Sequence, residues 1–102
     1  MPVRFSIFVS EGVRQDLAAL RAYDRQTVLD GIETQLSHAP HVATKQRKLL
    51  HNLVPPFEAL PPIWQLRVGA FRVFYDVNES EHRVYVRAVR KKPAHLTTEE
   101  IL

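Results

Sequence analysis

The sequence predicts an α+β fold with an N-terminal strand, a helical hairpin and a three-stranded antiparallel meander. Three observations indicate it: an alternating apolar segment opens the chain, two amphipathic segments follow, and three alternating segments separated by short turns occupy residues 63–90. The first strand and the meander would form a four-stranded sheet with the helices on one face. At 102 residues the chain fits a single domain, residues 1–102.

The first strand and the helical hairpin occupy the N-terminal forty or so residues. Apolar residues fill every second position from 3 to 9, and Arg4, Ser6 and Phe8 alternate with them. Ser10 suits the N-cap of a first helix, and Asp24 suits the cap of a second. Because proline cannot continue a helix, the second helix should end before Pro40. The short link between the two helices indicates a hairpin.

Residues 43–62 predict a basic, proline-rich loop. The stretch TKQRKLL is followed by VPPFEALPP, whose four prolines remove backbone donors and resist regular structure. The basic part is compatible with a helical turn or with a short strand. At the other end of the chain, residues 96–102 predict a short C-terminal helix or tail, since Thr97 and Glu100 can form a capping box.

The stretch LRVGAFRVFYDV, residues 66–77, predicts a tight β-hairpin. Gly69 and Ala70 fit a two-residue turn of type II′, which has glycine at its first central position. This turn places Arg67 directly opposite Arg72 on one face. The other face is apolar and should meet the helices; it carries Trp64, Leu66, Val68, Phe71, Val73 and Tyr75.

The register of the last strand is predicted from a four-residue loop at 78–81. That loop pairs Arg72 with Arg87 and Phe74 with Tyr85, and it keeps the arginines of the last strand out of the core. Arg87 would then extend the arginine pair into a row of three, beside an aromatic pair.

Such a row costs repulsion that a bound anion would relieve. Guanidinium groups bind phosphate oxygens bidentately, and aromatic rings stack on nucleobases. The face therefore predicts a site for single-stranded nucleic acid. The alternative is that glutamates elsewhere in the chain, or an acidic partner, neutralise the row.

The amino-acid composition limits the kinds of catalytic groups and binding sites that the protein can have. The net charge is +3, and residues 41–72 hold five basic side chains against one acidic side chain. The absence of cysteine excludes a thiolate nucleophile and fits a reducing cytosol. The five histidines show no metal-ligand spacing, so neither a metal nor another cofactor is expected. No apolar run reaches the length of a membrane span, and the N-terminus shows no signal-peptide pattern.

The segments WQLRVGAFRVFYDV and VYVRAVRKKP resemble the strands of the RelE/ParE superfamily of bacterial type II toxins, and the order of elements is similar along nearly the whole chain. The resemblance implies a cytoplasmic toxin that forms a hetero-oligomer with a cognate antitoxin. RelE-like members inhibit translation by cleaving messenger RNA in the ribosomal A site without a metal. Basic side chains hold the scissile phosphate while the 2′-OH attacks in line.

The predicted register and the resemblance together assign roles to individual residues. Catalytic roles fall on Arg67, Arg72, Arg87, Lys92 and His95. RNA-binding roles fall on Lys45, Arg47, Lys48, Phe74, Tyr85, Arg90 and Lys91. Many active RelE-like nucleases carry a C-terminal tyrosine that is missing here, and His95 is the candidate acid or base in its place.

Two other functions stay open. A ParE-like toxin would use the same fold to bind DNA gyrase without catalysis. The missing C-terminal tyrosine favours this alternative. A non-toxic member would use its basic face only to bind the antitoxin.

Overall fold

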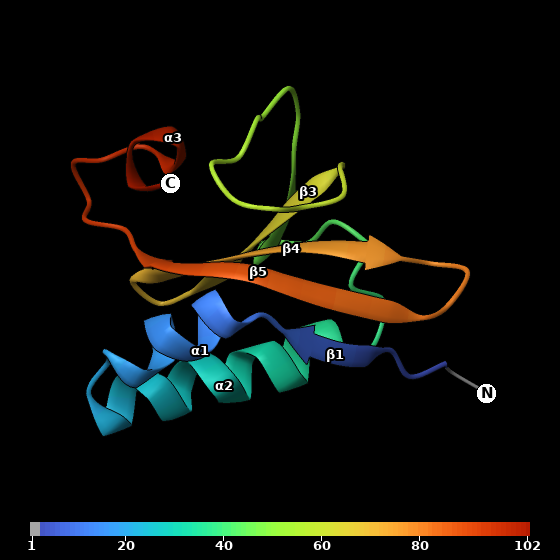
Figure 1. The fold of residues 1–102 in the computed structure, drawn as a ribbon, viewed down its shortest axis with the longest axis horizontal. Helices are drawn as coiled ribbons and strands as arrows, with labels where there is room; N and C mark the ends of the chain where they lie inside the picture. The colour runs from blue at the N-terminus through green and yellow to red at the C-terminus, as the bar shows by residue number, and fades with distance from the viewer. Residues whose placement is uncertain (1–2) are drawn as a thin grey trace.

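The computed structural model describes residues 3–102, which form one five-stranded sheet with three helices (Figure 1). The strand order is β1-β5-β4-β3-β2, in which β1 is parallel to β5 and the other neighbours are antiparallel. The strands are β1 (Ser6–Val9), β2 (Arg47–Leu50), β3 (Ile63–Val68), β4 (Phe71–Asn78) and β5 (Arg83–Lys91). The helices are α1 (Glu11–Ala18), α2 (Ala22–Leu36) and α3 (Thr98–Ile101). The predicted α+β class is confirmed, but the sheet has five strands instead of four.

The extra strand is β2, which lies within the stretch predicted as a basic loop. It pairs antiparallel with β3 and places Lys48 opposite Gln65. The strand begins after a turn in which the hydroxyl of Thr44 accepts hydrogen bonds from two successive backbone amides. The strand has only four residues, and so short a pattern of polar and apolar residues cannot distinguish a strand from a helical turn.

The helical hairpin forms where it was predicted, with one difference at its second cap. Ser10 caps α1, and its Oγ accepts a hydrogen bond from the amide of Val13 at 3.2 Å. The second helix begins at Ala22, two residues before Asp24, and its N-cap is Arg21. Asp24 therefore lies inside the first turn, where its carboxylate interacts favourably with the positive end of the helix dipole and stabilises the helix.

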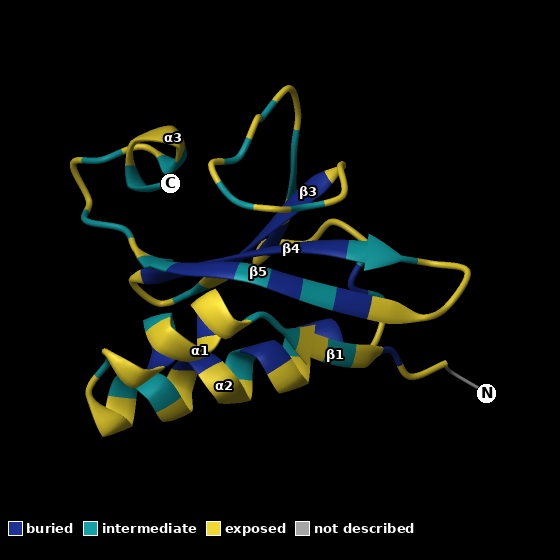
Figure 2. Ribbon diagram, viewed as in Figure 1, coloured by how far each residue is buried: buried dark blue, intermediate teal, exposed yellow. Residues whose placement is uncertain are grey.

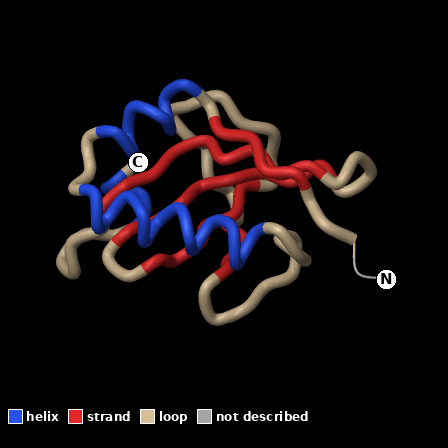
Figure 3. The backbone as a smooth tube through the Cα atoms, turned by 90° about the horizontal axis from the view of Figure 1, so that it is seen from below, coloured by secondary structure: helices blue, strands red, loops and turns tan. Residues whose placement is uncertain are grey.

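The main hydrophobic core lies between the sheet and helices α1 and α2, where the dark ribbon segments of Figure 2 gather. Figure 3 views the molecule from the side of these two helices. The apolar face predicted for the β3–β4 hairpin is in this core, and Leu66, Val73 and Tyr75 are fully buried. The hydroxyl of Tyr75 donates a hydrogen bond of 2.7 Å to the carbonyl of Pro40, so the segment after α2 is fixed to the sheet.

The register of the β3–β4 hairpin is confirmed. Arg67 pairs with Arg72 and Val68 pairs with Phe71 across the two-residue turn. Gly69 has φ of 56°, as the first central position of a type II′ turn requires.

The predicted register of β4 against β5 is wrong. Arg72 lies opposite Arg90, not Arg87, for two reasons. First, β4 continues to Asn78 and the loop is shifted toward the C-terminus, so the pairing next to the loop is shifted by two residues. A shift of two leaves these side chains on their predicted faces, and alternation alone cannot detect it. Second, an irregularity at Phe74/Tyr75 leaves Arg87 as an extra residue in β5, outside the ladder of paired residues, so the shift is three residues from Phe74 to Phe71.

The second face of the sheet is partly covered. Ile63, Phe74 and Ala88 form a smaller buried cluster, and side chains from the proline-rich loop and the C-terminus pack on it. These covering residues are Leu50, Leu53, Phe57, Ala59, Ile101 and Leu102. In Figure 1 the loop and α3 lie on the side of the sheet opposite α1 and α2, so not all helices share one face. No helix within residues 3–102 has the length and apolar character needed to span a bilayer.

Candidate functional site

A row of arginines crosses three neighbouring strands on the second face of the sheet. Strand pairing places Arg67 of β3 opposite Arg72 of β4, and Arg72 opposite Arg90 of β5. The row predicted from the sequence therefore exists with a different third member. We call Arg67, Arg72 and Arg90 the arginine row.

Arg72 is the most buried member, with 9% of its surface exposed. Its Nη1 donates to the carbonyls of Gly69 at 2.9 Å and Phe71 at 2.8 Å, so the guanidinium is fixed against the turn. Burial lowers the pKa of Arg72 from its usual value, and the charge of Arg67 lowers that pKa further. Within the described chain neither Arg67 nor Arg72 forms an ion pair with a carboxylate. The repulsion in this pair is therefore not compensated by another side chain.

Arg90 differs because α1 supplies it with a partner. The Nη1 atom of Arg90 lies 2.8 Å from Oδ2 of Asp16, and the same oxygen accepts a hydrogen bond from the amide of Val89. Since β1 pairs with β5 only as far as Val86, Asp16 satisfies a backbone donor of β5 beyond the end of β1. Asp16 thus fixes the orientation of Arg90 and removes part of the charge of the row.

Arg87, a predicted catalytic residue, lies outside the arginine row and has a carboxylate partner. Its Nε lies 2.7 Å from Oδ2 of Asp76, a carboxylate that is 1% exposed. Asp76 also accepts a hydrogen bond from the amide of Leu60, which fixes the proline-rich loop over the sheet. The carboxylates that neutralise Arg87 and Arg90 belong to aspartates, not to the glutamates that the sequence suggests as the alternative.

Two residues predicted to bind RNA are buried and hold the fold together. Phe74 is fully buried and contacts Phe57 of the proline-rich loop, so its ring is not available to a base. Arg47 is directed to the opposite face, where it donates to the carbonyls of Val42 and Gln35 near the end of α2. The alternation of β2 puts Arg47 inward and Lys48 outward, which could be predicted only once the strand was known.

The remaining predicted residues stay accessible. Lys45, Lys48 and Lys91 are exposed, and Lys48 lies on the same face as the arginine row because it pairs with Gln65. Lys92 is partly exposed, and its charge contributes to the lowered pKa of Glu100 in α3, after the larger contribution of hydrogen bonds from Thr97. His95, in the segment between β5 and α3, is exposed, and Tyr85 of β5 is partly exposed.

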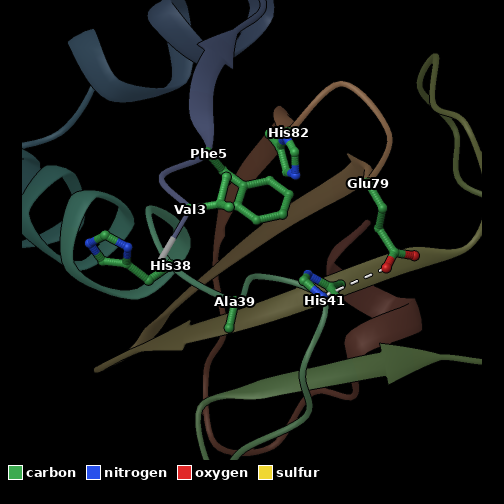
Figure 4. A pocket seen from close by; sticks show the side chains of 7 residues that line it. All are labelled: Val3, Phe5, His38, Ala39, His41, Glu79 and His82. Carbon is green, nitrogen blue, oxygen red and sulfur yellow. Dashed lines mark ion pairs between the residues drawn. The ribbon is translucent and has the colours of Figure 1, made fainter. Parts of the chain in front are cut away.

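A cavity of about 410 Å³ lies away from all the predicted site residues (Figure 4). It forms where the segment before β1, the loop after α2 and the β4–β5 turn meet; its lining is Val3, Phe5, His38, Ala39, His41, Glu79 and His82. The Nε2 atom of His41 lies 3.6 Å from Oε1 of Glu79. Despite the three histidines, no group in the described chain has three potential ligands placed for a metal ion.

Sequence reasoning missed Asp16 and Asp76 as partners of the arginines. Asp16 is 74 residues from Arg90 in the chain, and no local pattern connects them. The contact of Asp76 with Arg87 depends on the register of β4 against β5, which the sequence did not predict correctly.

The fold and the site together give an α+β protein whose sheet is backed by a helical hairpin on one face and carries a basic, partly covered second face. The family described as "ParE toxin of type II toxin-antitoxin system, parDE" matches residues 7–92. The chain therefore belongs to the RelE/ParE superfamily of toxins of type II toxin–antitoxin systems. No curated protein sequence matches it significantly.

Two solved structures share the fold. The toxin–antitoxin complex RelBE2 from Mycobacterium tuberculosis gives a TM-score of 0.71 at 20% identity, covering 88% of this chain and 93% of the other. The archaeal RelE–RelB complex from Pyrococcus horikoshii OT3 gives a TM-score of 0.69 at 17% identity, covering 92% of this chain and 100% of the other. At these identities the two structures establish the fold only.

Proposed function

We propose that this toxin is a metal-independent endoribonuclease that cleaves messenger RNA on the ribosome and so inhibits translation. The observation that carries the proposal is the Arg67–Arg72 pair, which places two cations opposite each other without a carboxylate partner in the described chain. A phosphate between them would turn repulsion into two charge-assisted contacts. Lys48, on the same face, extends the positive surface.

The pair supports the chemistry of phosphodiester cleavage by electrostatics. Arg72 is held by two carbonyls, so its guanidinium needs little reorganisation when negative charge develops on the phosphate. Arg67 is exposed and can reach a phosphate oxygen from the neighbouring strand. The 2′-OH of the RNA would attack in line and leave a cyclic phosphate. Lys92 and His95 are the candidates for proton transfer and leaving-group stabilisation, since His95 is exposed and Lys92 is partly exposed.

Induced expression tests this proposal. Wild-type protein should arrest growth and produce A-site cuts in a translated message, detected by primer extension. Arg67→Ala and Arg72→Ala should each reduce the cutting by two orders of magnitude or more, the scale of removing one charge-stabilising donor. Arg14→Ala is the matched control, because Arg14 is an exposed arginine of α1 on the other side of the sheet. Undiminished cutting by both row variants would exclude a catalytic role for the pair.

A second function is binding of DNA gyrase without catalysis. The observation that favours it is the match of residues 7–92 to the ParE toxin family, together with a C-terminal segment that contains no tyrosine. In that case the purified toxin would inhibit gyrase supercoiling and leave ribosome-bound messages intact. The arginine row would then serve as a binding surface only.

We also infer an antitoxin as the partner of this chain in the cytoplasm. Both solved relatives are described as complexes of a toxin with its antitoxin. An acidic segment of such a partner would suit the uncompensated charges of Arg67 and Arg72. Isothermal titration against the product of the neighbouring gene would test this, and absence of heat at micromolar concentrations would contradict it.

A further inference from the structure

Arg90 belongs to the arginine row by strand pairing, but its guanidinium group is turned away from the other two members. Its Nη1 atom donates to Oδ2 of Asp16 at 2.8 Å and to the carbonyl of Val89 at 3.0 Å. The same carboxylate oxygen accepts a hydrogen bond of 3.2 Å from the amide of Val89. Because the amide and the carbonyl of one strand residue point to the same edge of the strand, all three bonds lie at one edge of β5.

That edge of β5 faces away from Arg72. The strand order places β4 on one side of β5 and β1 on the other, and the pairing with β1 does not extend to Val89. In the described chain no strand covers the edge at Val89, and Asp16 of α1 occupies it instead. Burial and the charge of Arg67 lower the pKa of Arg72, and Arg90 is not a cause of this shift although the strands pair it with Arg72.

Opening of the contact between Asp16 and Arg90 would cost the protein little. The two side chains are 30% and 34% exposed, and ion pairs at such exposure contribute little to stability. Asp16 would keep the amide of Val89 as a partner after Arg90 leaves. Because residues directly opposite each other in a sheet have Cβ atoms about 5 Å apart, rotation of its side chain would bring the guanidinium group of Arg90 beside Arg72 on the second face.

We propose that Arg90 is a third phosphate ligand of the arginine row, held at the edge of β5 by Asp16 in the free protein, and that an RNA phosphate replaces the carboxylate of Asp16 on its guanidinium group. The inference rests on the proposed function, since it takes the anion of this face to be a phosphate of RNA. Without a ligand, the exchange is unfavourable because it would add a third positive charge beside Arg67 and Arg72. A phosphate removes that repulsion and gives Arg90 a charge-assisted contact in place of the lost ion pair.

A double-mutant cycle of Asp16 and Arg90 tests the exchange. The probe is a short, labelled, unstructured RNA, whose affinity is measured by fluorescence anisotropy at salt concentrations from about 50 to about 200 mM. Asp16→Asn should tighten binding roughly 2-fold to 5-fold at the low end, the scale of one exposed ion pair. It should also steepen the dependence of log affinity on log salt by about 0.7, the contribution of one phosphate contact in a single strand. Arg90→Gln should weaken binding by a factor similar to that gain, because the third ligand is lost.

Asp24→Asn is the matched control for the change in net charge. Asp24 is also paired with an arginine, Arg21, but it lies on α2 on the other side of the sheet. In the Arg90→Gln background, Asp16→Asn should raise the affinity no more than Asp24→Asn does, because no guanidinium group is left to release. Equal gains from the two asparagine substitutions in the wild-type background would overturn the exchange. Asparagine at position 16 keeps an oxygen for the amide of Val89, and thermal unfolding of each variant verifies the fold.

The outcomes separate the exchange from the proposed function. If Arg90→Gln binds RNA like wild type while Arg67→Ala binds weakly, the exchange is wrong and the role of the Arg67–Arg72 pair stands. Wild-type protein that does not bind RNA would also overturn the exchange, and primer extension would then decide the proposed function alone. If the cycle shows the expected coupling but no A-site cuts appear, Arg90 is a phosphate ligand as proposed and the proposed cleavage is the part that is wrong.

Discussion

At the scale of single residues, Arg72 is an example of a side chain whose position costs stability. It is nearly buried, lies opposite Arg67, and has a lowered pKa because of burial and of that neighbouring charge. Like charges directly opposite each other weaken a strand pair. Natural proteins retain such costs mostly where function needs them, so stability and activity should change in opposite directions at this pair.

Replacing the exposed member of the pair tests that expectation. Arg67→Gln should raise the free energy of unfolding by about 0.5 kcal/mol at low salt, because it removes the repulsion while keeping a polar side chain. The gain should shrink as salt is added, since exposed charges are screened. Urea denaturation at two salt concentrations measures both effects, and Arg14→Gln is the control. Growth inhibition by the variant should be lost although the protein is more stable.

Tyr75 predicts a dependence of stability on alkaline pH. Its ring is fully buried and its hydroxyl donates to the carbonyl of Pro40. Burial raises the pKa of Tyr75 far above its usual value, and the charge of Arg47 lowers it by a smaller amount. Because the folded-state pKa is the higher one, the stabilisation is complete below the ordinary tyrosine pKa of about 10 and declines as pH rises above it.

Tyr75→Phe isolates this contribution. At neutral pH the variant should lose about 1–2 kcal/mol of stability, because the carbonyl of Pro40 is left without its donor. Above pH ~10 the loss of stability with pH should be less steep than in wild type, since the buried phenol is absent. Chemical denaturation across the alkaline range measures the two slopes. Tyr23→Phe, at an exposed position, should change neither.

At the scale of the elements, the contact between α2 and β3 explains a glycine in the middle of a helix. A methyl group built on Gly31 would lie 2.8 Å from Cγ2 of Val68, closer than carbon atoms can approach without movement. Gly12 of α1 has no such neighbour, since its nearest contact would be Oγ of Ser10 at 3.8 Å. The two glycines therefore differ in environment although both lie in helices.

Replacing each glycine by alanine should change the stability of the protein in opposite directions. Gly31→Ala should destabilise the protein by about 1–3 kcal/mol, because overpacking against β3 outweighs the gain in helix propensity. Gly12→Ala should stabilise it by about 0.5–1 kcal/mol through propensity alone. Adding Val68→Ala to Gly31→Ala should recover part of the loss, and thermal unfolding measures all four proteins. Equal effects at the two glycines would show that the close approach of α2 to β3 is not what limits position 31.

At the scale of the whole molecule, the sequence predicts faces well and long-range pairings poorly. Alternation identified the core face of the β3–β4 hairpin, and the turn at Gly69 fixed its register. The predicted β4–β5 register is wrong because the two-residue shift next to the loop preserves the faces there, and the irregularity that leaves Arg87 unpaired and makes the shift three residues at Arg72 has no signature in the sequence. The covering of the second face, which buries Phe74, depends on contacts between distant segments. Two of the three members of the arginine row were nevertheless correct.

The two-sided architecture leads to a prediction about the C-terminal segment. Ile101 and Leu102 pack on the small cluster of Ile63, Phe74 and Ala88, and the hydroxyl of Thr98 in α3 donates to the side-chain oxygen of Gln65. Deleting residues 97–102 would expose apolar surface on the second face. The loss of two partly buried aliphatic side chains should cost about 2–4 kcal/mol of unfolding free energy, since each contributes on the order of 1–2 kcal/mol.

Hydrogen exchange can locate the effect of that deletion. Amides of the proline-rich loop should exchange faster, because the loop shares the small cluster with the C-terminal residues. Amides of α1 and α2 pack on the opposite face and should keep their protection relative to the global stability. The double substitution Ile101→Ser/Leu102→Ser keeps the chain length and should reproduce the result. Uniform loss of protection throughout the molecule would show instead that the two faces unfold as one unit.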